Sequence, residues 1–516
     1  MARSHRAERV LATLGALLVT ALLATACSNV QATPQAEGTG PAAPGSVPPS
    51  SSAKPSTPPP PTLVQLATDR GRQSQGVVAA AGGGAPYNYA PSVMLDGGRY
   101  RMWWCTQLGA VLPHGDDIVY AESGSADGPF ASPDGQQARP VFAGNNTGFD
   151  SVHVCDPSVL RVGATYYMYY TGADGDHPFG SAIGVATSPD GVNWTRANND
   201  VAILGPMHDV DRQNTYGSGQ PSVVFLDGWF YLMFTDTSGK GAAWNGAGQF
   251  VLRSTDPAFV SGVQTLTDRG FVLANGTKIA RERSIVEAFS ADWMWVDALN
   301  AFAIAHETDG GTTVTFWDRD FTMNPFRPVV IPGVWKEGPG LVRRADGHAP
   351  ISTEDPCGRV QLDVVRSTVE AAPGTPTDLR HFGIDIAGAP GCRTVDQAAV
   401  TLRGFAIPSP DRTIDLVVDG RLVRVERRSV ADRLALRVLD QRPAIADQIP
   451  LAARLPAGAK ALHAPDGSVG LVLDDNRLWS VGSAEVASAN SSPLIDVLMP
   501  LWADYAKGPD LASLRS

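Results

Sequence analysis

A phrase of four residues recurs in the first half of the chain and constrains the fold more than any other feature. It reads Ala90-Pro91-Ser92-Val93, Asp156-Pro157-Ser158-Val159 and Gln220-Pro221-Ser222-Val223, so its copies begin at positions 90, 156 and 220. Each copy runs into an apolar stretch, a small turn and an aromatic-rich strand. A nearly fixed period of this kind indicates one supersecondary unit used repeatedly. Within the phrase only the first residue changes its chemistry, so we look for function at that position.

Further strand signals follow each copy of the phrase. The segments 118–123, 183–188 and 250–255 read as a strand after the aromatic hairpin, and the turn Ser188–Trp194 introduces one more. A unit of roughly 60 residues with four short strands is typical of a propeller blade with generous loops. A β-sandwich would give no reason for the repeated phrase.

The same pattern continues more weakly toward residue 390. Residues 294–302 resemble the inner hairpin of a fourth blade, and residues 313–318 resemble its third strand. Residues 337–347 open a fifth blade, with outer strands expected at 360–365 and 381–386. The sequence therefore predicts an all-β fold, in which residues 63–392 form a five-bladed β-propeller.

The remaining residues, 393–516, contain no copy of the phrase. Residues 414–425 form a predicted hairpin with an Asp-Gly turn, and residues 469–481 form a second one. Residues 494–505 have the pattern of a terminal helix. We expect a small β-rich accessory domain.

The N-terminus has the character of an export signal. Three arginines precede an apolar run over residues 10–23, which is too short to span a membrane comfortably. The run ends in Leu23-Ala24-Thr25-Ala26-Cys27, which resembles a bacterial lipoprotein signal, although Ala24 stands where such signals usually have Leu. The resemblance implies a signal segment over residues 1–27, cleaved before Cys27, so that Cys27 is lipidated, becomes the mature N-terminus and anchors the protein on the outer face of the cell membrane.

Residues 28–62 are rich in Pro, Ser, Ala and Gly and end in four consecutive prolines. This composition cannot build a core and favours a disordered tether. The formal net charge of −11 argues against a nucleic-acid partner, because such proteins need a basic face.

Four cysteines remain after Cys27: Cys105, Cys155, Cys357 and Cys392. Their spacing matches no zinc motif, and an even number in an exported chain favours two disulfides. Four cysteines allow three connectivities, of which we predict Cys105–Cys155 and Cys357–Cys392.

Residues 85–390 resemble the five-bladed glycoside hydrolases of family 43 and its relatives with arabinofuranosidase, xylosidase and fructosidase activity. The resemblance is carried by Asp156–Val159 with Tyr166-Tyr167, by Ser188–Trp194, and by Glu337-Gly338-Pro339. It implies a carbohydrate substrate bound in a central funnel, where two carboxyl groups flank the scissile bond. It implies no cofactor; some related propellers hold a central calcium ion, for which the sequence gives only a weak indication.

The resemblance departs from the family at the first blade. The family places a base Asp, an Asp that tunes the acid, and an acid Glu on the first three blades, but Ala90 stands where the base is expected. If the pattern is shifted by one blade, Asp156 is the base, and the acid is either Glu287 or Glu337. Both alternatives remain open, because blades four and five each lie two steps from blade two.

Four further residues are predicted to contact substrate: Gln220, Asp211, Trp103 and Trp335. The main alternative to a glycosidase is a non-catalytic carbohydrate-binding lipoprotein that has lost its first-blade Asp. A protein-interaction propeller would favour an apolar or charged rim. A sialidase-like enzyme would need an arginine cluster at the strand starts, and the sequence shows none there.

Overall fold

The computed structural model describes residues 63–515, apart from 80–86, 109–110, 136, 176, 372–374 and 377. The predicted signal peptide, Cys27 and the tether lie outside the described residues. No helix among the described residues is long and apolar enough to cross a membrane.

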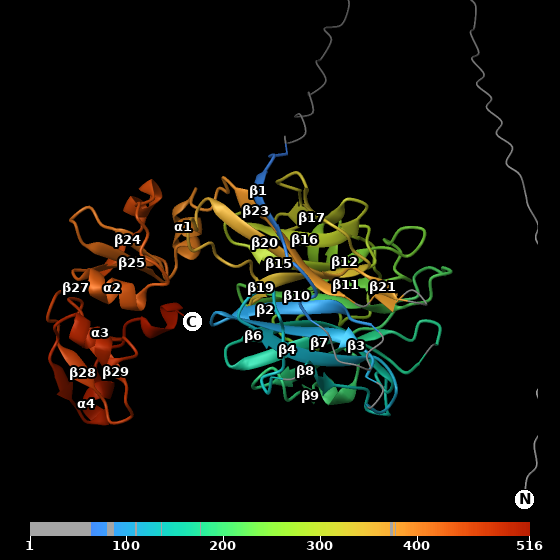
Figure 1. The fold of residues 1–516 in the computed structure, drawn as a ribbon, viewed down its shortest axis with the longest axis horizontal. Coiled ribbons are helices and arrows are strands. Elements are labelled where there is room, and N and C mark those ends of the chain that lie inside the picture. Colours follow the sequence, from blue (N-terminus) through green and yellow to red (C-terminus); the bar gives the residue numbers. More distant parts are fainter. Residues whose placement is uncertain are drawn as a thin grey trace, which may run out of the picture. The chain divides into compact units, whose positions relative to one another are not determined.

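Residues 63–392 fold almost entirely into β-structure, which follows the sequence repeat (Figure 1). We number the sheet units 1 to 5 by the order of their first strands. Unit 1 contains β2 (Tyr89–Asp96), β3 (Arg99–Thr106), β4 (Asp117–Ser123) and β5 (Arg139–Phe142). Unit 2 contains β6 (His153–Val162), β7 (Thr165–Ala173), β8 (Ala182–Ser188) and β9 (Thr195–Arg196). Unit 3 contains β10 (Ser218–Leu226), β11 (Trp229–Asp236), β12 (Gln249–Ser254), β13 (Gln264–Thr267) and β14 (Gly270–Leu273).

The weaker sequence signals also correspond to sheets. Unit 4 contains β15 (Ala291–Val296), β16 (Ala301–Thr308), β17 (Gly311–Trp317) and β18 (Val329–Pro332). Unit 5 contains β19 (Glu337–Arg344), β20 (Arg359–Ser367), β23 (Leu379–Ala387) and, at its outer edge, β1 (Ala67–Gln73). The short pair β21 (Glu370–Ala371) and β22 (Thr375–Pro376) lies between β20 and β23 in sequence. Strand β1 was not predicted, because its exposed, polar sequence ATDRGRQ carries no apolar alternation.

The first strands of the five units contact one another in a closed cycle. Strand β2 contacts β6, β6 contacts β10, β10 contacts β15 and β15 contacts β19. The cycle closes where β19 pairs in parallel with β2. Five apolar clusters lie between consecutive units, including the one between units 5 and 1, so the core lies in the interfaces between sheets.

The repeated phrase forms a β-bulge at the start of each of the first three inner strands. Pairing with the neighbouring strand shifts register between Tyr89 and Ser92 in β2, and at the equivalent positions in β6 and β10. The first residue of the phrase has left-handed backbone geometry in each copy, with φ of 48° at Ala90, 48° at Asp156 and 51° at Gln220. The following proline has no N–H to donate, which suits an unpaired bulge position. The bulge re-aims the side chain of the first residue.

The serine of the phrase links each unit to the next. Ser92 Oγ accepts a hydrogen bond from the Val159 amide at 3.0 Å, and Ser158 Oγ accepts one from the Val223 amide at 3.0 Å. Ser222 Oγ accepts from the Trp293 amide at 3.3 Å. These bonds explain why the phrase keeps its serine.

Arg343 of β19 lies at the centre of the cycle and is almost completely buried. Its guanidinium donates to Ser92 Oγ and Ser158 Oγ at 3.4 Å each and to Ser222 Oγ at 3.3 Å. Asp292 pairs with it at 3.1 Å and also accepts from the Leu341 amide at 2.7 Å. We call Ser92, Ser158, Ser222, Asp292 and Arg343 the hub.

Both predicted disulfides are confirmed. Cys105 at the end of β3 is bonded to Cys155 in β6, which ties units 1 and 2 together. Cys357, between β19 and β20, is bonded to Cys392, which follows β23.

The strands of residues 393–516 form sheets of their own. One contains β24 (Ala406–Pro408), β25 (Ile414–Val418), β26 (Arg421–Val425) and β27 (Leu451–Leu455). The other contains β28 (Ala461–His463), β29 (Val469–Val472), β30 (Leu478–Ser480) and β31 (Leu494–Asp496). The described residues of this part also form four α-helices: α1 (Val395–Thr401), α2 (Arg428–Leu434), α3 (Ala484–Ala489) and α4 (Met499–Asp504). Both predicted hairpins are confirmed, as β25–β26 and β29–β30.

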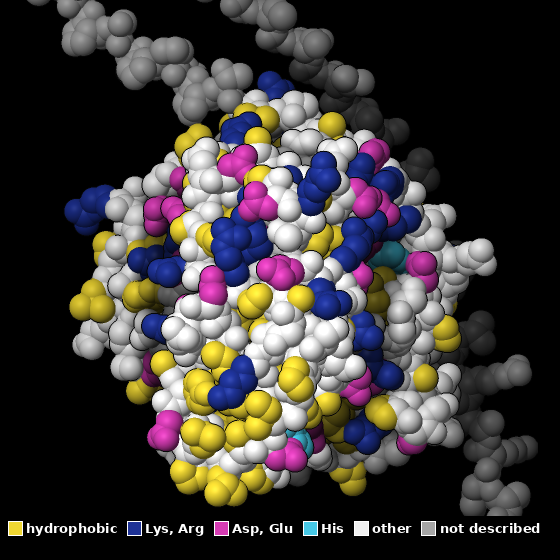
Figure 2. All heavy atoms as spheres, turned by 90° about the vertical axis from the view of Figure 1, so that its left-hand side faces the viewer, with side chains coloured by type: hydrophobic (Ala, Val, Ile, Leu, Met, Phe, Trp, Pro, Cys, Tyr) yellow, Lys and Arg dark blue, Asp and Glu magenta, His cyan; other side chains and the backbone are white. Residues whose placement is uncertain are grey.

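The predicted terminal helix over 494–505 is wrong in its extent. Residues 494–496 form β31, which pairs in parallel with β28, and only Met499–Asp504 form a helix, α4. Pro500 near the start of α4 suits a first helical turn. The exposed hydrophobic side chains of residues 494–505 include Leu494, Leu498 and Leu501. Hydrophobic side chains also gather on the lower part of the face drawn in Figure 2.

Candidate active site

The first residues of the inner strands converge above the hub on a small cavity, which we call the mouth. It is lined by Ala90, Asp156 and Gln220, by Ser290 and Pro339, and below by Arg343. Its volume of about 30 Å³ accommodates water but no sugar ring. A larger ligand would therefore lie across the mouth, in contact with side chains at its rim.

Asp156 lies at this rim and is only 8% exposed. One carboxylate oxygen accepts a hydrogen bond from the Tyr216 hydroxyl at 3.1 Å, and Thr171 also hydrogen-bonds to the carboxylate. Thr171 Oγ1 in turn accepts a hydrogen bond from the backbone N–H of Gln220 at 2.8 Å. The hydroxyl hydrogen of Thr171 is therefore left to donate to Asp156. Burial raises the pKa of Asp156 to about 6, while these two hydrogen bonds oppose the shift.

Glu337 begins β19 and stands one residue before the bulge of that strand. Burial and the negative charge of Asp156 together raise the pKa of Glu337 to about 7. The structure thus brings together two of the three carboxylates that the sequence singled out. They come from units 2 and 5, which are not neighbours in the cycle.

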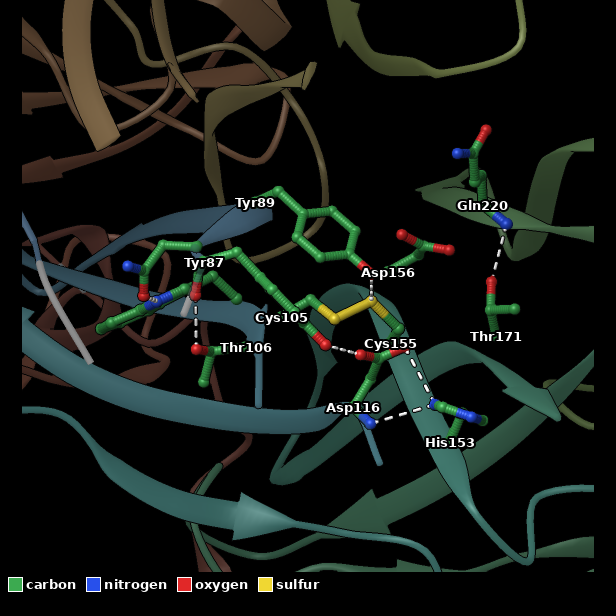
Figure 3. The surroundings of a disulfide bond; sticks show 12 residues. Tyr87, Tyr89, Cys105, Thr106, Asp116, His153, Cys155, Asp156, Thr171 and Gln220 are labelled. Atoms are coloured by element: carbon green, nitrogen blue, oxygen red, sulfur yellow. Dashed lines mark hydrogen bonds and ion pairs between the residues drawn. A yellow bond between two sulfur atoms is a disulfide. The ribbon is translucent and has the colours of Figure 1, made fainter. Parts of the chain in front are cut away.

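Two tyrosines that sequence reasoning missed complete this group. Burial and the charges of Asp156 and Glu337 hold the pKa of Tyr89 and of Tyr216 well above the ordinary value, so both remain protonated donors. The Tyr89 hydroxyl lies 2.9 Å from the sulfur of Cys155, and Figure 3 shows its ring beside Asp156 and the disulfide. Tyr89 directly precedes the first copy of the phrase, which is the one signal that could have indicated it.

Glu307 on β16 is a third carboxylate that the sequence did not indicate. Burial raises the pKa of Glu307 to about 7, and the charge of Glu337 contributes to the shift. Thr312 Oγ1 donates to its carboxylate at 2.9 Å, and Arg366 Nη1 lies 3.8 Å from it. Thr312 and Arg366 therefore hold Glu307 in place. Glu337, in contrast, forms no ion pair with a basic residue that the structure describes.

Of the predicted substrate contacts, Gln220 lines the mouth, whereas Trp335 lies in the segment before β19 and is not among the residues that line it. Gln220 lines the cavity, and its buried Oε1 has no hydrogen-bond partner among the described residues. Trp335 is half-buried two residues before Glu337, with its indole N–H bonded to the Thr308 carbonyl at 2.6 Å.

The other predicted site residues are not part of this group. Trp103 is completely buried, and its indole N–H donates to the Gly191 carbonyl at 2.8 Å, so no sugar can reach it and its predicted role is wrong. Glu287 is exposed on the loop between β14 and β15, and Asp211 is exposed on the loop before β10. Burial perturbs the pKa of Glu337 and of Asp156, whereas the exposed Glu287 keeps its contact with solvent.

Asp116 and His153 lie below Asp156, beside the disulfide (Figure 3). The Asp116 amide donates to His153 Nδ1 at 3.1 Å. The Asp116 carboxylate also lies within 4.8 Å of the sulfurs of Cys105 and Cys155, but a disulfide offers a metal no thiolate. The negative charge of Asp116 contributes to the raised pKa of Asp156.

Comparison with known proteins gives partial matches. No protein-family model matches the chain. The chain is 32% identical over 118 residues to an uncharacterized protein of Mycobacterium tuberculosis strain H37Rv, a match that covers 22% of this chain and 35% of that protein. An uncharacterized protein of strain CDC 1551 matches over the same lengths with the same identity. The match thus spans about a third of the length of these curated relatives.

Two similar solved structures are glycoside hydrolases. One is Zg3597, a family 117 glycoside hydrolase of Zobellia galactanivorans, with a TM-score of 0.41 and 14% identity over 62% of this chain and 91% of that chain. The other is the catalytic domain of the GH62 α-L-arabinofuranosidase of Coprinopsis cinerea, with a TM-score of 0.40 and 15% identity over 61% of this chain and 97% of that chain. At these TM-scores, neither neighbour decides the fold or the activity of this chain.

Proposed function

We propose that residues 63–392 form a five-bladed β-propeller, and that the mouth at its axis is the active site of an exported glycoside hydrolase. In this proposal each sheet unit is one blade and the hub fills the axis below the site. The observation that carries the proposal is that Glu337, at the start of β19, lies close enough to Asp156 of the mouth for the charge of Asp156 to raise its pKa. Hydrolysis of a glycosidic bond needs two carboxyl groups of this kind, one protonated and one ionised.

The raised pKa values support the following catalytic roles. Glu337, with its pKa raised to about 7, is the general acid that protonates the leaving oxygen. Asp156, with its pKa raised to about 6, is the ionised partner that activates water or attacks the anomeric carbon. Tyr216 and Thr171 hold the Asp156 carboxylate in one orientation while it carries its charge.

The rim supplies contacts for the sugar. The unpartnered Gln220 Oε1 can accept a hydrogen bond from a sugar hydroxyl, which would satisfy a polar atom that is otherwise costly to bury. The half-buried Trp335 offers an aromatic face for stacking beside Glu337. The substrate is therefore a glycosidic bond of a polysaccharide or oligosaccharide that reaches an enzyme outside the cytoplasm.

The test is hydrolysis of a panel of aryl glycosides and oligosaccharides by the full-length protein, Glu337→Gln and a matched control, Glu287→Gln. Turnover that is lost in Glu337→Gln and kept in Glu287→Gln supports the proposal. As the general acid, Glu337→Gln should retain more activity on activated aryl glycosides, which need less protonation. Equal loss in both variants would contradict the assignment of the acid.

A second candidate function is a non-catalytic carbohydrate-binding protein. It is favoured by Ala90, which puts a methyl group where the related hydrolases have a base. Saturable binding of a glycan without any turnover by the wild-type protein would establish this alternative.

We also propose that Cys27 is lipidated and anchors the protein on the outer face of the membrane. The proposal rests on the sequence of residues 10–27. Cys27→Ser should release the protein from the membrane fraction or block its maturation, and normal processing with unchanged membrane association would contradict it.

A further inference from the structure

A second, larger cavity lies between sheet units 3 and 4 and shares no residue with the mouth. Its volume is about 630 Å³, within the range of small-molecule sites, roughly 300 to 1,000 Å³. The wall comes from β12, the turn between β13 and β14, the loop before β15, and the loop after β17. Its lining residues are Arg253, Asp268, Arg269, Gly270, Phe271, Arg283, Asp320, Phe321 and Thr322.

Arg253 is held rigidly at this wall. Its Nε donates to Gln264 Oε1 at 2.8 Å and its Nη1 donates to the Tyr231 hydroxyl at 3.1 Å. Its guanidinium carbon lies 4.0 Å from the ring centre of Phe271 and 4.8 Å from that of Trp229. The stacking and the two bonds fix the plane of the guanidinium but leave Nη2 without an acceptor among the described residues.

Arg283 is fixed in a similar way. Its Nη1 donates to the Thr267 carbonyl at 3.0 Å and its Nη2 donates to the Phe321 carbonyl. Its guanidinium carbon lies 5.5 Å from the ring centre of Trp317. Arg269 is exposed at the same cavity, on the turn between β13 and β14. Two rigid cations and one adaptable cation therefore face a single space.

In the described part of the chain, none of these three arginines is in an ion pair, although the chain carries a formal net charge of −11. Elsewhere in residues 63–392, half-buried and buried arginines such as Arg196 and Arg343 face carboxylates. Uncompensated cations that are already ordered provide a ready site for an anion, because little side-chain entropy remains to be lost.

The cavity also contains two exposed carboxylates, Asp268 and Asp320, which form no ion pair with the three arginines. Three arginines and two aspartates leave one positive charge in excess. This balance suits a ligand with a single negative charge and disfavours a bare dianion. Carboxylates accept hydrogen bonds from hydroxyl groups, whereas a guanidinium pairs with a carboxylate in bidentate fashion.

We infer that this cavity binds an acidic sugar, a hydroxyl-rich ring that carries one carboxylate. The arginines bind the sugar carboxylate, and the aspartates bind hydroxyl groups. Phe271, half-buried at the wall, offers a partly apolar surface to the ring. This inference does not depend on catalysis at the mouth, since the two cavities have no lining residue in common.

The experiment is calorimetric titration of the full-length protein with glucuronate, glucose and sulfate at low ionic strength. We expect saturable binding of glucuronate, which weakens as salt is added. Glucose, which lacks the carboxylate, and sulfate, which lacks the ring and carries two charges, should each bind at least roughly tenfold more weakly.

Variants locate the site. Arg269→Gln removes an exposed charge without breaking a side-chain contact and should weaken glucuronate binding by roughly tenfold. Arg421→Gln, at an exposed position on β26, is the matched control and should leave binding unchanged. Arg253→Lys keeps the charge but loses the planar fork, so it should also weaken binding, with its melting temperature measured alongside.

Three outcomes would overturn the inference. They are equal binding of glucose and glucuronate, sulfate binding as tight as that of glucuronate, and undiminished glucuronate binding in Arg269→Gln and Arg253→Lys together. The result is separable from the proposed hydrolase activity, because Glu337→Gln should bind glucuronate as the wild type does.

Discussion

The mouth and the hub share one cavity and take residues two positions apart from the same four-residue phrase, yet they differ in backbone geometry and in charge pairing. The mouth takes the first residue of the phrase, which changes from Ala90 to Asp156 to Gln220 and keeps left-handed backbone geometry. The hub takes the third residue, which is serine in all three copies. Beside the mouth the negative charge of Asp156 raises the pKa of Glu337, whereas in the hub Arg343 and Asp292 form an ion pair.

The difference shows where the fold tolerates strained backbone geometry. Left-handed geometry in a non-glycine residue costs of the order of 1–2 kcal/mol. Such positions persist only where the surroundings over-determine them, and the inter-unit hydrogen bonds of Ser92, Ser158 and Ser222 lie next to each of them. The hub therefore supports the mouth, and mutations in the two regions should separate activity from stability.

The largest expected effect is on activity at the mouth. Asp156→Asn should lower kcat on the order of 10³-fold or more, because the amide can neither attack carbon nor activate water. The melting temperature should change little, since the asparagine can keep the bond to Tyr216 and the variant no longer buries a charge. Steady-state kinetics and thermal unfolding on the same preparation check this. Loss of activity together with unfolding would place Asp156 with the hub instead.

The second effect is on stability in the hub. Asp292→Ala leaves the Arg343 guanidinium buried without a counter-ion, so we expect a loss of about 3–5 kcal/mol in the free energy of unfolding. Removing both charges, in Asp292→Ala with Arg343→Met, should recover part of that loss because no unpaired charge remains. Urea denaturation measures both variants. A double variant less stable than Asp292→Ala would contradict the charge-pairing role.

The third prediction concerns pH. Activity requires Asp156 ionised and Glu337 protonated, so the rate should follow a narrow bell with limbs near pH 6 and pH 7, which belong to the coupled pair. Both carboxyl groups have raised folded-state pKa values. They favour the fold below the ordinary carboxyl pKa, and this contribution is lost as pH rises through about 6 and 7. Melting temperatures from pH 4 to 8 should therefore fall less steeply in Glu337→Gln than in the wild type.

A smaller effect separates the serines from the aspartate of the hub. Ser158→Ala removes the hydroxyl oxygen that accepts hydrogen bonds from the Val223 amide and from the Arg343 guanidinium, so we expect about 1–2 kcal/mol of destabilisation. Activity per folded molecule should remain. Urea denaturation and kinetics at a temperature well below unfolding distinguish the two quantities. A large loss of kcat without a loss of stability would contradict the division between hub and mouth.

The comparison also indicates what the sequence could predict. The repeated phrase, the hairpins and both disulfides could be predicted from the sequence, because each depends on a local residue pattern or on units that are neighbours along the repeat. Strand β1 was not, because a polar edge strand owes its conformation to β23 rather than to its own residues. Asp292 was missed because the fourth unit reads Ser290-Ala291-Asp292 where the phrase has its variable residue, its proline and its serine.

The site was predictable only in part. Asp156 and Glu337 were found from the frame of the repeat and from the resemblance. Tyr216 reaches Asp156 from a loop and Glu307 lies near Glu337 on a second strand, and no spacing along the chain marks either of them. Trp103 was assigned to substrate because aromatic residues suit both sugars and cores, and only its packing against Gly191 shows which applies.

The smallest predicted effect tests the strain at the mouth itself. Ala90 has φ of 48° and carries no group that the proposed chemistry uses. Ala90→Gly relieves the left-handed strain, of roughly 1–2 kcal/mol, but adds roughly 0.5–1 kcal/mol of backbone entropy to the unfolded chain. We therefore expect a gain of about 0.5 kcal/mol in stability with kcat unchanged. The variant Asp156→Gly relieves the same strain but leaves the Tyr216 and Thr171 hydroxyls without their acceptor, so it should be less stable than Ala90→Gly and should abolish turnover. Precise thermal unfolding of both variants decides: if Ala90→Gly destabilises the protein, the bulge is not strained, and the left-handed geometry of Asp156 carries no energetic cost for the hub to offset.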